Sequence, residues 1–499
     1  MAEKPAAPAS ERAPAAALET VETVDVKAVN TRDVRALYKK REKIFPRRAR
    51  GSFRNLKWAV MAVTLAIYYL APWLRWDRGP LAPDQAILID IPARRFYFFF
   101  IEIWPQEVYY ITGILVIAAM ALFLFTSLAG RVWCGYACPQ TVWVDLFLAI
   151  ERLIEGDRTA RIRLERAAWS LSKIAKRLVK HVIWLIIAAL TGGAWVFYFA
   201  DAPTLFVDLL TLRAPEIGYI TVGVLTATTY LLGGLAREQV CTFMCPWPRI
   251  QAAMIDEESL IISYHPGRGE PRGPSGRGGK RDGLGDCVAC NQCVVVCPMG
   301  IDIRDGMQLE CISCALCIDA CDGVMDRFDK PRGLISYDTL ANIEGGESTG
   351  RARIRWLRPR TVIYGVIIAI VGSIMLAALM TRPALDLNVL RDRNPLFVTL
   401  SDGSVRNGYT LKILNKLHAV RDYRLSVEGL PGARIKVIGR DDGDAVFTVR
   451  PDRLASFRVF ISTDRANLKG EVTDMRLVLT DRQDGARADY ETNFRGPRR

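Results

Sequence analysis

The chain has 499 residues, half of them apolar, and its Lys and Arg outnumber Asp and Glu by 67 to 53, a net charge of +14. This length predicts roughly three domains. The basic residues lie beside long apolar runs, which indicates a membrane surface rather than nucleic acid as the partner. Three histidines and the lack of a C-x-x-C-H sequence argue against a haem-rich cytochrome. Soluble hydrolases and DNA-binding proteins are disfavoured by the same composition.

The N-terminal segment, residues 1–38, is rich in Ala, Pro and Glu and lacks the apolar stretch of a signal peptide. We therefore predict a disordered tail. Beyond it lie five apolar stretches close to the roughly 20 residues that cross a bilayer. Buried helices of a globular protein are the alternative for any one stretch, but five nearly uncharged stretches favour a membrane domain. They occupy about 57–74, 108–128, 181–200, 217–235 and 361–380.

Basic residues gather in three segments, at 39–50, 158–180 and 351–360. Because cytoplasmic loops carry an excess of Lys and Arg, these segments are predicted to face the cytoplasm, with the N-terminus inside and the C-terminus outside. The aromatic run Phe96 to Phe100, with Trp104, is expected to form a belt at the outer membrane surface. A buried aromatic core is its alternative.

Eight cysteines form two copies of the spacing C-x2-C-x2-C-x3-C, and only the first copy ends in proline; the second has Asp322 there. In bacterial ferredoxins the first three cysteines of a copy hold one [4Fe–4S] cluster and the fourth holds the other. Two zinc sites are the alternative, but zinc sites usually separate two C-x2-C knuckles by a dozen or more residues. We expect cluster 1 on Cys287, Cys290, Cys293 and Cys321, and cluster 2 on Cys311, Cys314, Cys317 and Cys297.

Two further cysteine pairs, each followed by proline, come just after the second and fourth apolar stretches. The pairs Cys134–Cys138 and Cys241–Cys245 recur in matching positions, which indicates duplication of a two-helix unit. Proline favours the first turn of a helix, so Cys138 and Cys245 are expected at helix N-caps, where a thiolate is stabilised. Such pairs suit Cu(I) or a reversible disulfide; buried cysteines that merely pack are the alternative.

After the fifth stretch the sequence changes to short alternating runs separated by turn signals at Asn407-Gly408, Leu430-Pro-Gly432 and Asp442-Gly443. This pattern predicts an all-β immunoglobulin-like sandwich. A Gly/Pro/Arg-rich linker is predicted at 266–286. The predicted domains are the tail (1–38), a membrane domain with four spans (39–256), an α+β ferredoxin-like domain with two [4Fe–4S] clusters (257–345), the fifth span (351–382) and the sandwich (383–499).

This order of elements resembles the cytochrome c oxidase accessory protein family (CcoG, also called FixG or RdxA), from about residue 35 to the end. The stretch 406–416 resembles the start of that family's outer domain. The resemblance implies a multi-pass protein of the bacterial inner membrane that acts in cbb3-type cytochrome c oxidase assembly and reduces Cu(II) to Cu(I). It implies copper or redox sites at Cys134, Cys138, Cys241 and Cys245, and cluster ligation by the other eight cysteines.

The partners expected from this reading are membrane lipid, a copper-exporting P-type ATPase, oxidase subunits and a cytoplasmic electron donor. No NAD(P) or flavin fingerprint names that donor. Whether the two pairs meet in one molecule or across a homodimer is left open. Two other functions remain as alternatives: a quinol-linked electron-transfer module, and a non-enzymatic scaffold for oxidase assembly.

Overall fold

The computed structural model describes residues 23–30, 42–80, 82–273, 283–345, 355–417, 419–439, 445–451 and 453–497. Most of the predicted tail, part of the predicted linker and the turn at Asp442-Gly443 lie outside these residues. The chain divides into two compact units. One contains 1–74 and 85–373, with most of the long helices and the cysteine-rich segment, and the other contains 75–84 and 374–499.

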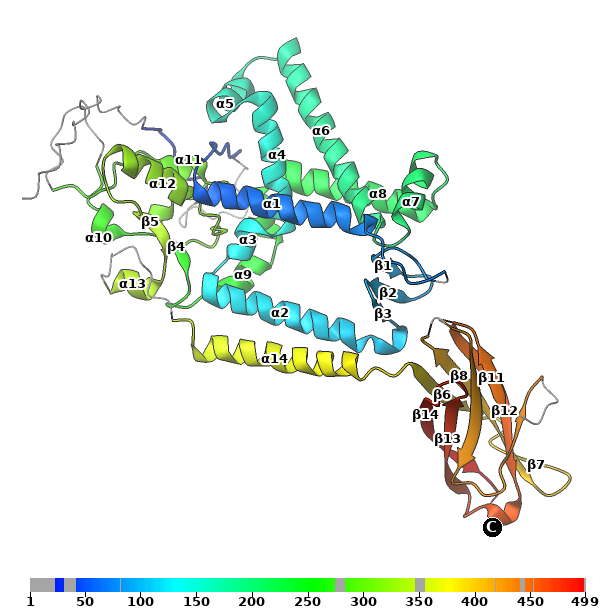
Figure 1. Ribbon diagram of the computed structural model, residues 1–499. Coiled ribbons are helices and arrows are strands. Elements are labelled where there is room, and N and C mark those ends of the chain that lie inside the picture. Colours follow the sequence, from blue (N-terminus) through cyan, green and yellow to red (C-terminus); the bar gives the residue numbers. More distant parts are fainter. Residues whose placement is uncertain are drawn as a thin grey trace, which may run out of the picture. The chain divides into compact units, whose positions relative to one another are not determined.

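Five helices of the described chain are long and apolar enough to cross a membrane, as the sequence predicts. Three of them, α1, α2 and α14, are drawn lengthwise in Figure 1. The third, α6, begins ten residues before the expected position because Ser170 Oγ accepts a hydrogen bond from Lys173 N at 3.3 Å and caps a basic first turn. The five helices are α1 (Ser52–Leu70), α2 (Tyr109–Ala129), α6 (Leu171–Val196), α8 (Glu216–Thr229, continued by the π-helix η4, Tyr230–Ala236) and α14 (Pro359–Met380).

The aromatic run after the first span is not a simple belt. It forms part of a three-stranded antiparallel sheet, β1 (Ile87–Asp90), β2 (Arg95–Phe98) and β3 (Ile101–Ile103). Tyr97 and Trp104 are buried, whereas Phe98 and Phe100 are exposed. The alternation of a strand therefore divides the run between a packed side and an exposed side.

Shorter helices connect the spans. They are η2 (Ala71–Trp73), η3 (Pro105–Glu107), α3 (Val132–Tyr136), α4 (Pro139–Glu155), α5 (Arg158–Arg166), α7 (Ala202–Leu210), the π-helix η5 (Val240–Met244) and α9 (Trp247–Ala252).

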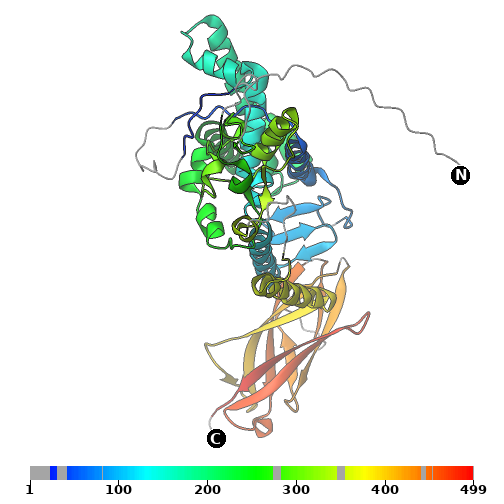
Figure 2. The ribbon, with the colours of Figure 1, turned by 90° about the vertical axis from the view of Figure 1, so that its left-hand side faces the viewer.

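The ferredoxin-like segment packs on the same unit as the helices (Figures 1 and 2). Its ends pair as a two-stranded antiparallel sheet in which Ile261 of β4 lies opposite Asp338 of β5. Part of the predicted linker is ordered, because Arg268 Nε lies 2.7 Å from Asp286 Oδ2. The elements are β4 (Ile261–Tyr264), α10 (Pro266–Gly269), α11 (Gln292–Val296), η6 (Ile303–Asp305), α12 (Leu316–Arg327), β5 (Ile335–Asp338) and α13 (Leu340–Glu344).

The C-terminal unit is the predicted immunoglobulin-like sandwich. Its sheets have the strand orders β10-β12-β8-β6, with β7 on β8, and β11-β9-β13-β14. The strands are β6 (Leu385–Arg391), β7 (Val398–Thr399), β8 (Val405–Asn415), β9 (Arg421–Glu428), β10 (Arg434–Val437), β11 (Val446–Val449), β12 (Arg453–Thr463), β13 (Val472–Asp481) and β14 (Arg487–Arg495), with the short helix η7 (Arg465–Asn467) after β12.

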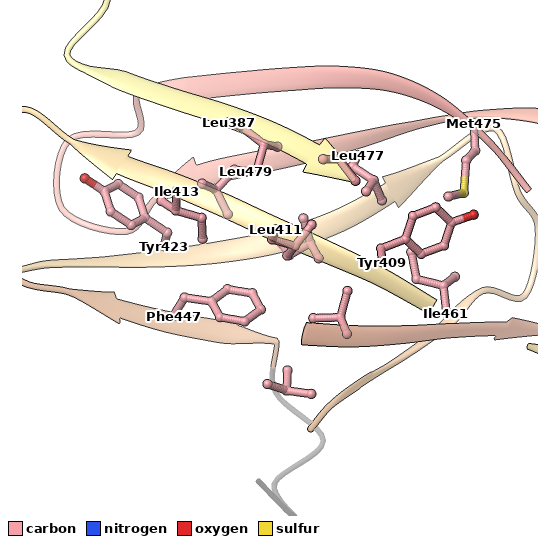
Figure 3. Close-up of a cluster of buried hydrophobic side chains, with 14 of the residues drawn as sticks. Leu387, Tyr409, Leu411, Ile413, Tyr423, Phe447, Ile461, Met475, Leu477 and Leu479 are labelled. Carbon is pink, nitrogen blue, oxygen red and sulfur yellow. The ribbon is translucent and has the colours of Figure 1, made fainter. Parts of the chain in front are cut away.

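The core of the sandwich follows strand alternation. Tyr409, Leu411 and Ile413, two residues apart on β8, are fully buried between the sheets (Figure 3). The turn predicted at Asn407-Gly408 is wrong, because both residues lie inside β8. Glycine is used there for space: a Cβ on Gly408 would stand 2.3 Å from Asp392 Oδ2.

Candidate functional site

The two cysteine-rich loops have the same backbone. In the first loop Ala289 and Asn291 have φ of 51° and 58°, and in the second Ser313 and Ala315 have φ of 54° and 61°. Non-glycine residues rarely adopt these left-handed angles. A helix starts directly after each loop, α11 at Gln292 and α12 at Leu316. Backbone strain repeated at equivalent positions indicates two loops shaped for the same ligand.

The structure brings the predicted cluster 2 cysteines together around one cavity. Cys297 reaches this cavity from the first copy, and Cys311, Cys314 and Cys317 come from the second. Cys293, assigned to cluster 1, also lines it, and apolar side chains complete the lining. The crossed assignment of the fourth cysteine stays a prediction.

The predicted cluster 1 cysteines also gather, in the apolar core between β4, α11 and α12. Burial raises the pKa of the Cys321 thiol, and the nearby Cys293, Cys290 and Cys287 raise it further. Burial also raises the pKa of Cys293 to about 12. A bound metal ion would lower the pKa values of these thiols and displace their protons, as it does for other metal-ligating cysteines.

The arrangement fits clusters better than zinc. Among the described residues, no three Cys, His, Asp or Glu side chains are arranged to hold one metal ion. A structural zinc draws four ligands to about 2.0–2.3 Å from a single atom, whereas a cubane takes each thiolate on a different iron. The two groups of four cysteines therefore suit two [4Fe–4S] clusters.

Asp322 replaces the proline of the first copy because α12 continues through this position to Arg327, whereas α11 ends at Val296 before Cys297. Proline in a helix interior removes a backbone hydrogen bond. The Asp322 carboxylate instead accepts a hydrogen bond from Gly333 N at 2.9 Å. Cys321 thus approaches its cluster from a helix rather than from a turn.

The two membrane-edge pairs occupy different local structures. Cys138 is the N-cap of α4, as expected, but Cys245 ends η5 and precedes the N-cap of α9, which is Pro246. The expected second N-cap is therefore displaced by one residue. The duplicated motif folds as α-helix in its first copy and as π-helix in its second, a difference that the matching C-x-x-x-C-P spacing does not reveal.

All four paired cysteines nevertheless meet within one chain. Burial raises the pKa of Cys134 to about 11, with Cys138 and Cys245 adding repulsion and Arg131 opposing it. Burial likewise raises the pKa of Cys241 to about 12, and the other three cysteines add to that shift. For Cys134 and Cys241 the loss of hydration outweighs the nearby arginine, so burial keeps their pKa values raised. No dimer is needed to bring the pairs together.

The first pair packs directly on the loop of cluster 2. A Cβ on Gly135 would stand 2.7 Å from Ile312 O and 2.8 Å from Ser313 O, so only glycine permits this approach. Arg131, just before the first pair, donates a hydrogen bond to Leu309 O, just before the loop of cluster 2. The Cys134 thiol lies in the same apolar cluster as Cys314.

A second small cavity, which Cys241 lines, adjoins the cluster 2 cavity, since Met299 and Ile312 line both. Met299 is buried in the same apolar cluster as Cys134. Sequence reasoning missed it, and its only signal was its place two residues after Cys297.

The ferredoxin-like segment also caps the first membrane helix. Gly51, the N-cap of α1, has no side chain, and the Asp319 carboxylate of α12 accepts hydrogen bonds from Phe53 N (3.1 Å) and Arg54 N (2.7 Å). An acidic side chain at a helix N-terminus satisfies free N–H groups and complements the helix dipole. The cap joins α12 to α1.

Three family models match the chain: a 4Fe-4S dicluster domain at 236–340, a 4Fe-4S binding domain at 111–155, and the immunoglobulin-like fold at the C-terminus of FixG, a putative oxidoreductase, at 375–497. The chain is 54% identical to nitrogen fixation protein FixG of Rhizobium meliloti, over 96% of this chain and 97% of that protein. Protein RdxB of Cereibacter sphaeroides is 54% identical (92% and 98% covered), and its protein RdxA is 52% identical (93% and 99%).

Proposed function

The chain belongs to the FixG and RdxA family of iron–sulfur membrane proteins, and from this premise we propose that it reduces Cu(II) to Cu(I) with electrons from a cytoplasmic donor. The Cu(I) serves assembly of a cbb3-type cytochrome c oxidase and passes to a copper-exporting P-type ATPase. The oxidase and the ATPase enter through the family resemblance. The basic segments support an orientation with the clusters in the cytoplasm and the sandwich outside the inner membrane.

The single observation that carries the proposal is the contact between the paired cysteines and the cluster 2 site. Met299 and Ile312 line both the cavity that Cys241 reaches and the cavity of the cluster 2 cysteines. Gly135 places the first pair against the backbone of the same loop. When bound, [4Fe–4S] clusters supply one-electron transfer, the stoichiometry that Cu(II) reduction requires.

The paired cysteines, all four in the described part of the chain, are not arranged to hold a metal ion in this structure, and we propose that they close on copper as it binds and favour the product. Thiolates are soft ligands and select Cu(I). Because burial raises the pKa of Cys134 to about 11, its thiol gives up a proton only as copper binds. The Cys134 thiol donates to Gln251 Oε1 at 3.0 Å, so the Gln251 side chain orients the sulfur before the metal arrives. Cu(II) gains one electron from the donor, and each coordinating thiol releases its proton to solvent.

The test uses detergent-purified, dithionite-reduced full-length protein to which Cu(II) is added without oxygen. The reduced-cluster EPR signal and chelator-trapped Cu(I) are followed together. We expect matched loss of the signal and gain of Cu(I), slowed at least about tenfold when Cys134, Cys138, Cys241 and Cys245 are all changed to serine. A Met307→Leu variant is the control, because Met307 is partly exposed and lines neither of the two cavities. Cu(I) formation that does not depend on the four cysteines would refute the proposal.

Iron content tests whether the paired cysteines hold a third [4Fe–4S] cluster instead of copper. The matching 4Fe-4S binding domain at 111–155 contains only Cys134 and Cys138, so a cluster there needs the second pair as well. Copper or disulfide chemistry predicts about eight iron atoms per chain, with or without the four cysteines. A loss of about four iron atoms in the serine variant would assign a third cluster to the pairs.

A further inference from the structure

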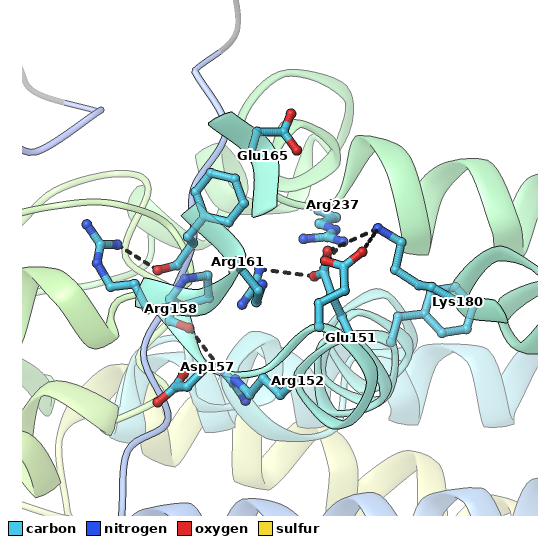
Figure 4. A network of polar contacts seen from close by, with 12 residues as sticks. Glu151, Arg152, Asp157, Arg158, Arg161, Glu165, Lys180 and Arg237 are labelled. Atoms are coloured by element: carbon cyan, nitrogen blue, oxygen red, sulfur yellow. Dashed lines mark hydrogen bonds and ion pairs between the residues drawn. The ribbon is translucent and has the colours of Figure 1, made fainter. Parts of the chain in front are cut away.

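A second polar site lies away from the cysteines, where α4 and α5 meet the start of α6 and the end of η4. At its centre Glu151 Oε2 lies 3.0 Å from Arg161 Nη2 and 2.9 Å from Arg237 Nη2, and Glu151 Oε1 lies 3.5 Å from Lys180 Nζ (Figure 4). Glu155 Oε1 extends the network, 2.8 Å from Lys180 Nζ. One carboxylate thus serves three cations.

The network holds more positive than negative charge. Five cationic side chains face three carboxylates: Lys43, Arg161, Arg177, Lys180 and Arg237 against Glu151, Glu155 and Glu165. Around the network, Asp157 lies with both Arg152 and Arg158 (Figure 4), and the buried Glu238 follows Arg237 in the chain. Lys180 and Arg161 are almost fully buried, with 2% and 0% of their side chains exposed. Lys43 and Arg177 lie at the rim, with 58% and 24% of their side chains exposed. The buried part of the network therefore has one excess positive charge, and the whole network has two, which favours a bound anion at the rim.

The same residues line a cavity with room for such an anion. Its volume is about 230 Å³, and four of the five cations line it together with Glu151 and Glu165. Its remaining wall is largely apolar and aromatic, with Phe45, Trp184 and Leu235. The ring of Trp184 stacks on Phe147 at 5.3 Å and its indole N–H donates to Phe147 O, which fixes the aromatic wall.

The position of the cavity sets the kind of anion. Two of its walls, α6 and η4, belong to membrane-spanning helices, at the ends where the basic residues gather. A ligand there meets cations on one side and apolar side chains on the other. Phospholipid headgroups have this division, and basic pockets between membrane helices bind lipids that carry more than one phosphate.

We propose that this cavity binds the phosphate groups of an anionic lipid, with cardiolipin, which carries two phosphodiesters, as the best match to the two excess charges. Lys43 and Arg177 at the exposed rim pair with the phosphates. The buried Lys180 and Arg237 remain paired with Glu151, and they attract the phosphates by their electrostatic potential without contacting them. The lipid tails leave along the apolar wall beside Leu235. The inference is independent of copper reduction.

The test titrates cardiolipin into full-length protein in phosphatidylcholine-containing micelles and counts bound lipid by native mass spectrometry. We expect one cardiolipin per chain. A Lys43→Gln/Arg177→Gln variant should bind it about thirtyfold more weakly, as two basic groups of about 1 kcal/mol each predict. The matched control is Arg163→Gln/Lys176→Gln, which removes the same charge from exposed positions on α5 and α6 outside the cavity. Unchanged iron content shows that both variants fold.

The other outcomes overturn the proposal in distinguishable ways. An equal loss of cardiolipin binding in the rim and control variants would mean that the basic surface attracts anionic lipid without a specific site. Equal binding of phosphatidylcholine would remove the role of charge. Displacement of the lipid by millimolar inorganic phosphate would assign the cavity to a free phosphate ion, and displacement by a neutral quinone analogue would assign it to a quinol.

Discussion

Replacing Gly135 with alanine tests the contact between the first cysteine pair and the cluster 2 loop. The added methyl would stand 2.7 Å from Ile312 O and 2.8 Å from Ser313 O. Ordinary contact begins near 3.4 Å, so the loop must retreat by about 0.7 Å. Overpacking of this kind costs about 1–3 kcal/mol. The better helix propensity of alanine returns at most about 1 kcal/mol, because Gly135 lies in α3.

The assay is the half-life of the cluster absorbance of purified protein at a fixed denaturant concentration, together with the rate of Cu(I) formation. We expect Gly135→Ala to shorten the half-life and to slow Cu(I) formation, since the added methyl pushes the paired cysteines away from the loop. The control is Gly323→Ala in α12, where a Cβ meets nothing within 4 Å and should stabilise the helix. If the two variants behave alike, the proposed close approach is wrong.

Substitutions at three further positions test the surroundings of the clusters and the charged network. Asp319→Ala should cost about 1–2 kcal/mol by removing the cap of α1, and Asp319→Asn should cost less because it keeps an acceptor; thermal unfolding of both variants measures the difference. Asp322→Pro should cost about 3 kcal/mol by breaking α12 and should lower the iron content, while Asp322→Ala should retain iron. Glu151→Gln should cost about 3–5 kcal/mol at neutral pH, because it leaves buried cations unpaired. Burial opposes ionisation of Glu151, but Arg237, Arg161 and Lys180 hold its pKa below the usual value. The ionised Glu151 therefore stabilises the folded protein fully above the unfolded pKa of about 4.3, and this contribution is lost as the pH falls through the folded pKa. The stability difference between wild type and Glu151→Gln, followed by acid titration, should therefore shrink only as the pH falls through the lowered folded pKa of Glu151; a constant difference would contradict this reasoning.

Local patterns in the sequence predict much of this protein. The repeated cysteine spacing predicts that the eight cysteines gather in one segment, as the structure shows, and it assigns the fourth cysteine of each copy to the other cluster as a prediction. The five spans are equally visible, since length and hydropathy suffice to find them. The alternation of β8 likewise predicts the core of the sandwich.

The features that the sequence does not reveal depend on distant residues. The approach of Gly135 to Ser313 joins positions 178 residues apart, and no local pattern in either segment announces it. The same holds for Met299, whose neighbour Cys241 lies in the other motif. The aromatic run at Phe96 to Phe100 suggested a membrane belt because β-strand and interfacial patterns share the same residue types. The π-helix at Cys241 has no equivalent signal.

The cap that Asp319 places on α1 has a consequence for how the protein is made. Its donors, Phe53 and Arg54, are translated some 265 residues before their acceptor. At a synthesis rate of about 5–20 residues per second, roughly 13 to 53 seconds pass between the synthesis of the first span and that of Asp319. During that interval the N–H groups at the start of α1 lack the Asp319 acceptor. Asp319 belongs to the segment that carries the cluster cysteines. The completion of the first membrane helix therefore depends on the folding of the segment that carries the cluster cysteines.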